Sequence, residues 1–215
     1  MQYKKRARSE AAKSERKDAI IAAAETLLRQ LGCDAITMQA VAMEAGLAKG
    51  TLYLYFPSNE ILFLDVYGRL FDRWIDRFAS HVSEVTGVNE FCQDFCRYYS
   101  DDHLFLQLTG TAISSMESQV DRETFIKGKR AMVGRVKKLA GTAYLRLGMN
   151  PILAQKFIWG LLTIASGAIQ MTIRPPAASN HLPKDVNAYI GSASFEAVFL
   201  NAAVPLCAGV MRDNT

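Results

Sequence analysis

Several residue types are scarce in this sequence of 215 residues, and each scarcity excludes a class of protein. It holds 6 prolines and 14 glycines, too few for a strand-and-turn protein or a low-complexity chain. Its 3 histidines, His81, His103 and His181, are scattered. No Ser-His-Asp context, phosphate loop or metal-ligand pair accompanies them. We therefore expect a protein that is not an enzyme and that uses no cofactor and no metal.

The 4 cysteines have neither C-x-x-C nor metal-ligand spacing, so a reduced, cytoplasmic protein is expected. The basic start runs into Ser, Glu and Ala rather than an apolar stretch, which argues against a signal peptide. Residues 157–173 and 192–211 nearly lack charge, but the first is short for a membrane span and both contain polar residues. We expect buried or partner-facing helices there, with a membrane span as the lesser alternative.

Half of the residues are apolar, and the apolar periodic segments favour Ala, Leu, Met and Gln over alternating β-branched residues, which indicates helices. The sequence predicts an all-α fold with two domains: a smaller three-helix domain over residues 1–59 and a larger helical domain over residues 60–215. Beyond residue 59, helices are expected over 60–82, 89–99, 101–116, 121–147, 151–173 and 192–211. Gly87, Gly148, Pro175-Pro176 and residues 180–185 mark the joints.

Positive charge is concentrated at the start of the chain. The net charge is +4 overall, yet residues 1–17 alone carry +5. A polyanion that meets this end of the chain explains such an asymmetry, although basic tails also occur as solvated arms. The basic residues are Lys4, Lys5, Arg6, Arg8, Lys13, Arg16 and Lys17.

The first sixty residues predict three short helices. An apolar stripe of Ile20, Ala24, Leu27 and Leu31 indicates a first helix over residues 14–31. Thr37 has the character of an N-cap for a second helix. The run Ala45-Gly46-Leu47 fits a tight turn between crossed helices. A third helix is expected over residues 48–55, with Pro57-Ser58 breaking it.

The third helix carries an outward face suited to DNA. Leu52 and Phe56 can face the core, which leaves Lys49, Thr51, Tyr53 and Tyr55 outside. Lys and Tyr can contact phosphates, and Thr offers a hydroxyl and a methyl to base edges. Each signal alone also occurs in ordinary helical hairpins, but their combination is specific.

Residues 16–67 resemble the DNA-binding domain of the tetracycline-repressor (TetR) family. The matching run extends from Ile36 to Glu60. The family pattern has a Thr that opens the second helix, an Ala-Gly-Val/Leu turn and a Lys-Gly-Thr-Leu-Tyr-x-Tyr-Phe recognition helix. Two positions depart from it: Ala48 stands where Ser is usual, and Asn59 where Lys is usual. Each departure removes a polar or charged group that the pattern directs toward DNA.

The resemblance implies specific DNA contacts. Thr37 and Tyr55 are expected to hold phosphates, and Tyr53 to lie against the backbone or a thymine methyl. Lys49, Gly50 and Thr51 are then expected deepest in the major groove, and Ala48 and Asn59 are the two altered DNA-facing positions, with Asn59 making at best a neutral phosphate contact. Glycine is unfavourable inside a helix, so Gly50 also indicates a close approach to the backbone; a mere N-terminal position in a short helix explains it nearly as well.

For the rest of the chain the resemblance implies a helical regulatory domain whose last two long helices pair with a second subunit. Gly160, Ala165, Gly167 and Ala168 form a small-residue surface consistent with close helix packing. A cluster of aromatic and Met residues is the candidate pocket for an apolar or aromatic effector, although plain core packing is the more common role of such residues. The candidate pocket residues are Phe91, Phe95, Tyr98, Tyr99, Phe105, Met116, Phe125 and Trp159.

The leading hypothesis is a homodimeric repressor that an effector releases from a palindromic operator in double-stranded DNA. The alternative is an effector-independent, architectural DNA-binding dimer in which the aromatic residues are solid core. An enzyme is the least supported class.

Overall fold

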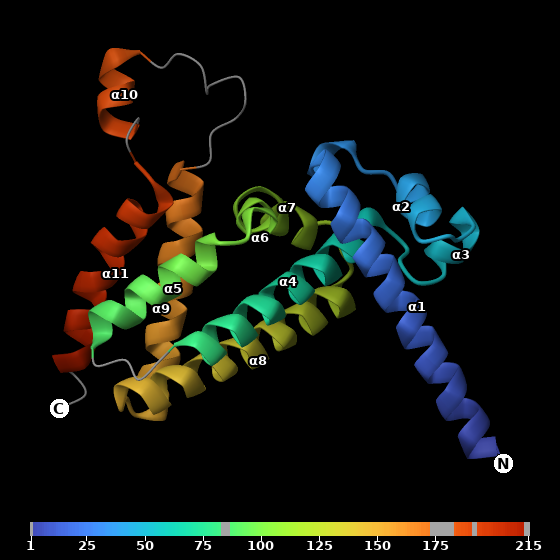
Figure 1. Cartoon of the computed structure of the whole chain (residues 1–215), viewed down its shortest axis with the longest axis horizontal. Coiled ribbons are helices and arrows are strands. Elements are labelled where there is room, and N and C mark those ends of the chain that lie inside the picture. Colours follow the sequence, from blue (N-terminus) through green and yellow to red (C-terminus); the bar gives the residue numbers. More distant parts are fainter. Residues whose placement is uncertain (1, 83–86, 173–182, 191–192, 213–215) are drawn as a thin grey trace. The chain divides into compact units, whose positions relative to one another are not determined.

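The computed structural model describes residues 2–82, 87–172, 183–190 and 193–212, and every regular element within them is helical (Figure 1). The all-α fold class expected from the sequence is confirmed. In chain order the elements are α1 (Gln2–Leu31), η1 (Cys33–Ala35), α2 (Met38–Glu44), α3 (Lys49–Tyr53), α4 (Asn59–His81), α5 (Val88–Ser100), α6 (His103–Gln107), η2 (Leu108–Ala112), α7 (Ile113–Glu117), α8 (Arg122–Leu147), α9 (Pro151–Thr172), α10 (Lys184–Ile190) and α11 (Phe195–Arg212).

The chain forms two compact units. Unit 1 comprises Met1–Arg69 and Ala112–Phe125, and unit 2 comprises Leu70–Thr111 and Ile126–Thr215. The division expected after residue 59 falls at the start of α4, whereas the compact units divide farther along the same helix. α4 therefore contributes side chains to both units.

Unit 1 is built on α1, with α2 packed against α1 and α3 against α2. Ile20, Ala24 and Leu27 are buried as the apolar stripe predicts, whereas Leu31 is 53% exposed. Ion pairs join α1 to α4: Lys17 Nζ lies 2.5 Å from Asp65 Oδ2, and Arg69 bonds Asp18. These exposed pairs fix the direction of α1 more than they add stability.

The first helix begins earlier than predicted. α1 starts at Gln2 rather than near Ser14, because the preceding segment is rich in Glu, Ala, Lys and Arg, which propagate a helix beyond its last core contact. The expected basic arm is thus the first part of α1. The side chains of Lys4, Lys5, Arg6 and Arg8 lie outside the described residues.

Unit 2 packs α11 against both α5 and α9 (Figure 1). At its centre is a set of rings that we call the aromatic cluster. Its members are Phe71, Trp74 and Phe78 of α4, Phe91, Phe95 and Tyr99 of α5, Phe105 of α6, and Phe195 and Phe199 of α11. Adjacent rings have centroids 5.0–5.9 Å apart in these pairs, within the range in which edge-on and offset stacking stabilise a core.

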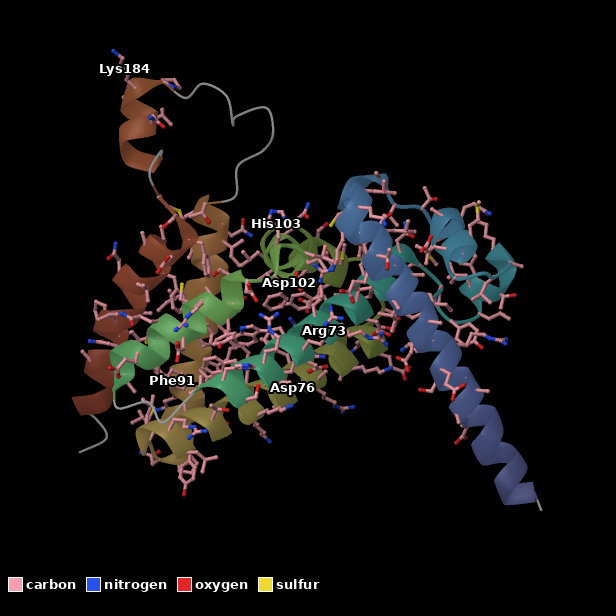
Figure 2. The ribbon with its side chains drawn as sticks, in the orientation of Figure 1. Arg73, Asp76, Phe91, Asp102, His103 and Lys184 are labelled. Carbon is pink, nitrogen blue, oxygen red and sulfur yellow. The ribbon has the colours of Figure 1, made fainter. Side chains whose placement is uncertain are left out.

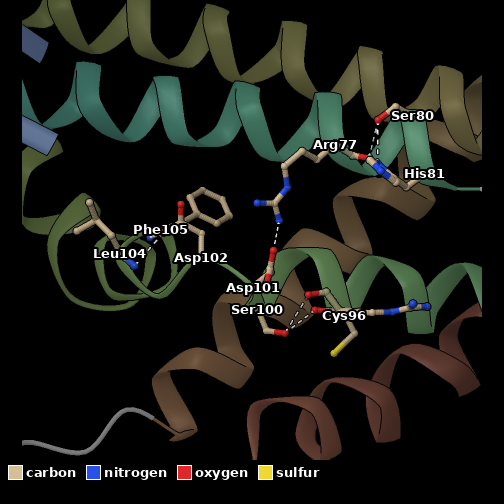
Figure 3. Close-up of polar contacts among 10 residues, drawn as sticks. Arg77, Ser80, His81, Cys96, Ser100, Asp101, Asp102, Leu104 and Phe105 are labelled. Atoms are coloured by element: carbon tan, nitrogen blue, oxygen red, sulfur yellow. Dashed lines mark hydrogen bonds and ion pairs between the residues drawn. The ribbon is translucent and has the colours of Figure 1, made fainter. Parts of the chain in front are cut away.

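Polar contacts fix the neighbours of the aromatic cluster. Arg135 of α8 makes two bonds of 2.8 Å to the Asp72 carboxylate of α4, and Lys138 pairs with Asp76, also on α4. Figure 2 shows Asp76 on α4 and Phe91 on α5. Arg77 of α4 lies 2.5 Å from Asp101, at the end of α5 (Figure 3). These contacts hold α4 to both α5 and α8.

The segment predicted as one helix over residues 101–116 is divided into three short helices, α6, η2 and α7. Asp102 is the N-cap of α6 and accepts hydrogen bonds from the Leu104 and Phe105 amides (Figure 3), so the helix begins at His103, two residues after the predicted start (Figure 2). The following run of Thr109, Gly110 and Thr111 has low helix propensity and widens into the π-helix η2. Gln170 of α9 donates a hydrogen bond to the Gly110 carbonyl.

The helix α10 was not predicted, because its 7 residues were assigned in part to a joint. Pro175-Pro176, expected as a joint, lies outside the described residues. The other helix boundaries agree with the predictions to within three residues.

α9 is long and apolar enough to cross a membrane, and 44% of its most apolar window is buried in this structure. Its buried residues, among them Phe157, Leu161, Ala165 and Ala168, recur at three- and four-residue steps. This is the pattern of a helix packed along one side, and the opposite side is exposed.

Burial divides the cysteines into two chemical groups. Cys92 and Cys207 are buried with their Sγ atoms 2.7 Å apart. The pKa of Cys92 is raised far above its ordinary range, mainly by the hydrogen bond with Cys207 and to a smaller extent by burial. Burial, with a smaller contribution from Glu196, raises the pKa of Cys96 to about 12.

We expect iodoacetamide at neutral pH to modify only Cys33 in the folded protein. The raised pKa values of Cys92 and Cys96 keep these thiols protonated, and only the thiolate is nucleophilic. Cys207 is 0% exposed and out of reach of the reagent. Mass spectrometry should find one adduct in buffer and four in denaturant, and a Cys33→Ser control should show none in buffer. Modification of Cys92 or Cys207 in buffer would contradict the packing of α5 on α11.

Candidate nucleic-acid interface

The turn between α2 and α3 is specified by three residues. Gly46 has φ of +65°, a left-handed conformation that glycine adopts without steric cost. Its amide donates to the Met43 carbonyl over 3.1 Å, and the Leu47 amide donates to the Ala42 carbonyl over 2.8 Å. These two bonds form a Schellman motif. The turn expected at Ala45-Gly46-Leu47 is confirmed.

The recognition helix α3 rests on a buried base. Leu52 within it and Phe56 after it are both 0% exposed, and the Lys17 ammonium lies 5.3 Å above the Phe56 ring. The structure therefore pairs Lys17, one of the predicted basic residues, with Asp65 and Phe56. A short helix of 5 residues is marginal alone, so this base determines which face of α3 points outward.

The predicted DNA-facing residues lie on the accessible side of unit 1. Ala48, Lys49 and Gly50 are exposed, Tyr53 is 41% exposed, and Thr51 and Tyr55 are half-buried. Thr37 is exposed and caps α2, because its hydroxyl oxygen accepts from the Ala40 amide over 3.2 Å. A hydroxyl can accept one bond and donate another, so the Thr37 proton stays available to a phosphate oxygen.

The two departures from the family pattern have structural consequences. Ala48 is the N-cap of α3 and provides no side-chain bond to it. The missing Ser hydroxyl is therefore absent from the start of the recognition helix as well as from the DNA-facing surface. Asn59 is half-buried at the start of α4, and its Oδ1 is a buried acceptor with no partner among the described residues.

Two exposed apolar residues beside this surface were missed. Leu54 is 80% exposed and Met43 is 71% exposed. Apolar side chains can contact thymine methyl groups in the major groove. The sequence offered one signal for Leu54: it falls outside the core pattern set by Leu52 and Phe56.

The structure brings together only some of the predicted pocket residues. Phe91, Phe95, Tyr99 and Phe105 are buried in the aromatic cluster, and Tyr98 lies at its edge against His81 and Phe78. Trp159 is 46% exposed on α9. Met116 and Phe125 belong to unit 1. The α4 members, Phe71, Trp74 and Phe78, were missed, although their i, i+3, i+7 spacing marks one face of a helix.

The capped turn, the short outward helix and its buried base define a helix-turn-helix DNA-binding protein. Residues 20–66 match the family described as "Bacterial regulatory proteins, tetR family". Residues 68–214 match the "Tetracyclin repressor-like, C-terminal domain". The chain belongs to the TetR family, and it is a DNA-binding transcriptional regulator rather than an enzyme.

Curated relatives match over part of their length. The chain is 42% identical over 80 residues to the transcriptional repressor KstR of Mycobacterium tuberculosis, covering 37% of this chain and 36% of that protein. It is 37% identical over 129 residues to the regulator RutR of Escherichia coli K12, covering 56% and 61%. The matches thus span less than two thirds of these relatives.

Solved structures share the fold over most of the chain. The Thermus thermophilus repressor FadR, in complex with lauroyl-CoA, has a TM-score of 0.59 at 16% identity and covers 91% of this chain and 94% of that one. The Bacillus subtilis regulator FadR, in complex with stearoyl-CoA, has a TM-score of 0.55 at 19% identity and covers 89% and 97%.

We predict opposite effects of Gly50→Ala on folding and on DNA binding. An added Cβ meets no atom within 4 Å in the free protein, so the substitution should stabilise the chain by about 0.5 kcal/mol because alanine favours helix. Operator affinity should fall if DNA approaches the backbone at Gly50. Thermal melts and gel shifts measure the two effects separately.

Ala48→Ser is the matched control for this substitution. It should also stabilise α3, by about 1 kcal/mol through an N-cap bond, while adding only a hydroxyl at an exposed position. Operator affinity should be retained or increased. Unchanged DNA binding by Gly50→Ala would show that Gly50 serves the free helix alone.

Proposed function

We propose that this protein is a homodimeric transcriptional repressor that binds a palindromic operator and is released by a small apolar or aromatic effector. The observation that carries the proposal is the outward face of α3, where Lys49, Gly50 and Thr51 are accessible above the buried Leu52. One such helix reads half a site, so a palindrome requires two chains. Leu54, beside Tyr53, adds an apolar contact to the same face.

The exposed side of α9 supports pairing with a second copy. Ile152 and Trp159 are 70% and 46% exposed, and they are seven residues apart, so they share a helix face with Thr163 and Gln170. The exposed side of α11 carries Asn201, Pro205 and Ala208, none of which is charged. Lys156 is the exposed charge on this face of α9 among the described residues. Two adjacent helix faces that are largely uncharged and partly apolar fit an isologous dimer interface.

The small residues of α9 divide between the two sides of the helix. Gly160 lies against Leu206 of α11, since a Cβ there would come 2.7 Å from the Leu206 Cδ2 atom. Ala165 and Ala168 are buried in the chain's own core, whereas Gly167 is exposed. Gly160 thus serves the α9–α11 contact within one subunit, and Gly167 permits close approach by the partner.

The effector part of the proposal rests on the aromatic cluster and on α4. Phe71, Trp74 and Phe78 line one face of α4 within unit 2, and the same helix begins in unit 1 directly after α3. A ligand that displaces these rings therefore acts on a helix that both units share. Two proteins of the same fold were crystallised with acyl-CoA thioesters, which makes apolar chains a reasonable first class to test.

An effector-independent DNA-binding dimer is the second candidate. The observation that favours it is the closure of the aromatic cluster, in which Phe91, Phe95 and Phe105 are each 0% exposed. Direct ligand-binding measurements separate the two candidates.

Operator selection tests the repressor proposal. From a random DNA pool the protein should enrich a palindrome, with affinity that falls steeply as salt rises. Lys49→Ala should weaken binding about ten-fold or more by removing a groove contact from each subunit. Lys137→Ala, which removes an exposed charge from α8, should leave affinity unchanged. Enrichment of no palindrome, or equal loss in both variants, would exclude this function.

A second experiment addresses the dimer. Trp159→Glu places a charge on the exposed face of α9 and should give a monomer by light scattering with an unchanged helical spectrum. Operator affinity should fall with it, because a monomer binds only a half-site. Lys137→Glu is the matched control, expected to remain dimeric. A Trp159→Glu dimer would place the interface elsewhere.

A further inference from the structure

We propose that the indole of Trp74 is the hydrogen-bond anchor for a neutral, apolar effector that carries a carbonyl oxygen. The ligand's apolar body would lie among the rings of the aromatic cluster, and its carbonyl would accept a bond from Trp74 Nε1–H. The proposal rests on the effector site of the proposed function and names the ligand chemistry of that site.

The first observation is an unpaired buried donor. Trp74 is 3% exposed, and its Nε1 has no hydrogen-bond partner among the described residues. A buried donor without a partner costs about 1–3 kcal/mol, so such groups are rare in folded proteins. Of the described residues, the other buried orphan side-chain atom is Asn59 Oδ1, which belongs to unit 1.

The second observation is the chemistry around Trp74. The centroid of its ring lies 5.4 Å from the centroid of Phe71, 5.1 Å from that of Phe95 and 5.1 Å from that of Tyr99, and all three pairs are edge-on. Phe78 and Phe105 stack on it at 5.9 and 6.1 Å. An N–H pointed at a ring gains less than an N–H paired with oxygen. Contacts between the Trp74 N–H and these rings are therefore weaker than the hydrogen bond that a ligand oxygen could accept.

A bound water satisfies Trp74 less well than a ligand carbonyl. A buried water needs two to four polar partners, and of the five described rings packed around Trp74 the four phenylalanines carry no polar atom, which leaves the Tyr99 hydroxyl. A carbonyl on an apolar body is satisfied by a single donor. The site thus favours a ligand that brings one acceptor and much apolar surface.

The same surroundings select against a charged ligand. Burying a carboxylate without a cation is far more costly than burying a neutral carbonyl. Arg77, one turn beyond Trp74 on α4, is paired with Asp101 at 2.5 Å (Figure 3). The anchor is therefore expected to accept a ketone, ester or thioester oxygen and to reject a free acid.

The test uses three probes of similar size: 4-phenyl-2-butanone, butylbenzene and 3-phenylpropanoate. The chain has 2 tryptophans, so the full-length, nitrogen-15-labelled protein gives two indole N–H signals, and the one lost in Trp74→Phe belongs to Trp74. The ketone should move this signal downfield. It should bind about ten-fold more tightly than the hydrocarbon and more tightly than the acid. In Trp74→Phe the preference for ketone over hydrocarbon should disappear.

Three results would overturn the anchor: no binding of any probe, equal binding of ketone and hydrocarbon, or a Trp74 signal that the bound ketone leaves unmoved. If Trp74→Phe does not fold, Trp159→Phe assigns the same two signals, and the wild-type titrations still decide. Gel shifts on the selected operator separate this proposal from the proposed function. A ketone that shifts the Trp74 signal without releasing DNA supports the anchor and refutes the effector role.

Discussion

One continuous helix, α4, constrains both halves of this molecule. Its buried residues recur at three- and four-residue steps from Leu62 to Phe78, so a single stripe enters the core of unit 1 and then the core of unit 2. Ion pairs fix the same helix from several sides, to α1 through Asp65 and Arg69 and to α8 through Asp72 and Asp76. α4 therefore contributes buried residues to the cores of both units.

Local chemistry made the first sixty residues largely predictable. Thr37 as a cap, Gly46 as a left-handed turn residue and Leu52 as a core contact each follow from interactions within a few residues along the chain. The start of α1 was predicted wrongly because an apolar stripe marks where a helix is buried, and not where it begins. The sequence could reveal the missing Ser hydroxyl at Ala48, but only the structure shows that this position is the N-cap of α3.

Contacts between segments that are distant along the chain could not be predicted from the sequence. Nothing in residues 92 and 207 indicates that their sulfur atoms lie 2.7 Å apart. The predicted pocket residues were chosen by type, and type alone did not separate Phe95, which is buried, from Trp159, which is exposed. The difference comes from which face of α5 or α9 meets α11, and that depends on how three helices pack together. The π-helix η2 was missed for a related reason, since its Gly110 carbonyl is paired with Gln170, 60 residues away.

The aromatic cluster explains why core and pocket need not be alternatives in this fold. Phenylalanine rings alone form a closed apolar core with nothing left to satisfy. Trp74 differs from its neighbours by one buried N–H that the described residues do not pair, so the same set of rings is stable yet carries an unmet hydrogen bond. A ligand that meets this bond gains free energy that a purely apolar compound does not. Suppose that ligand binding and DNA binding favour different positions of α4. The ligand's binding free energy then differs between these two conformations, and this difference is the most by which the effector can shift the equilibrium between them.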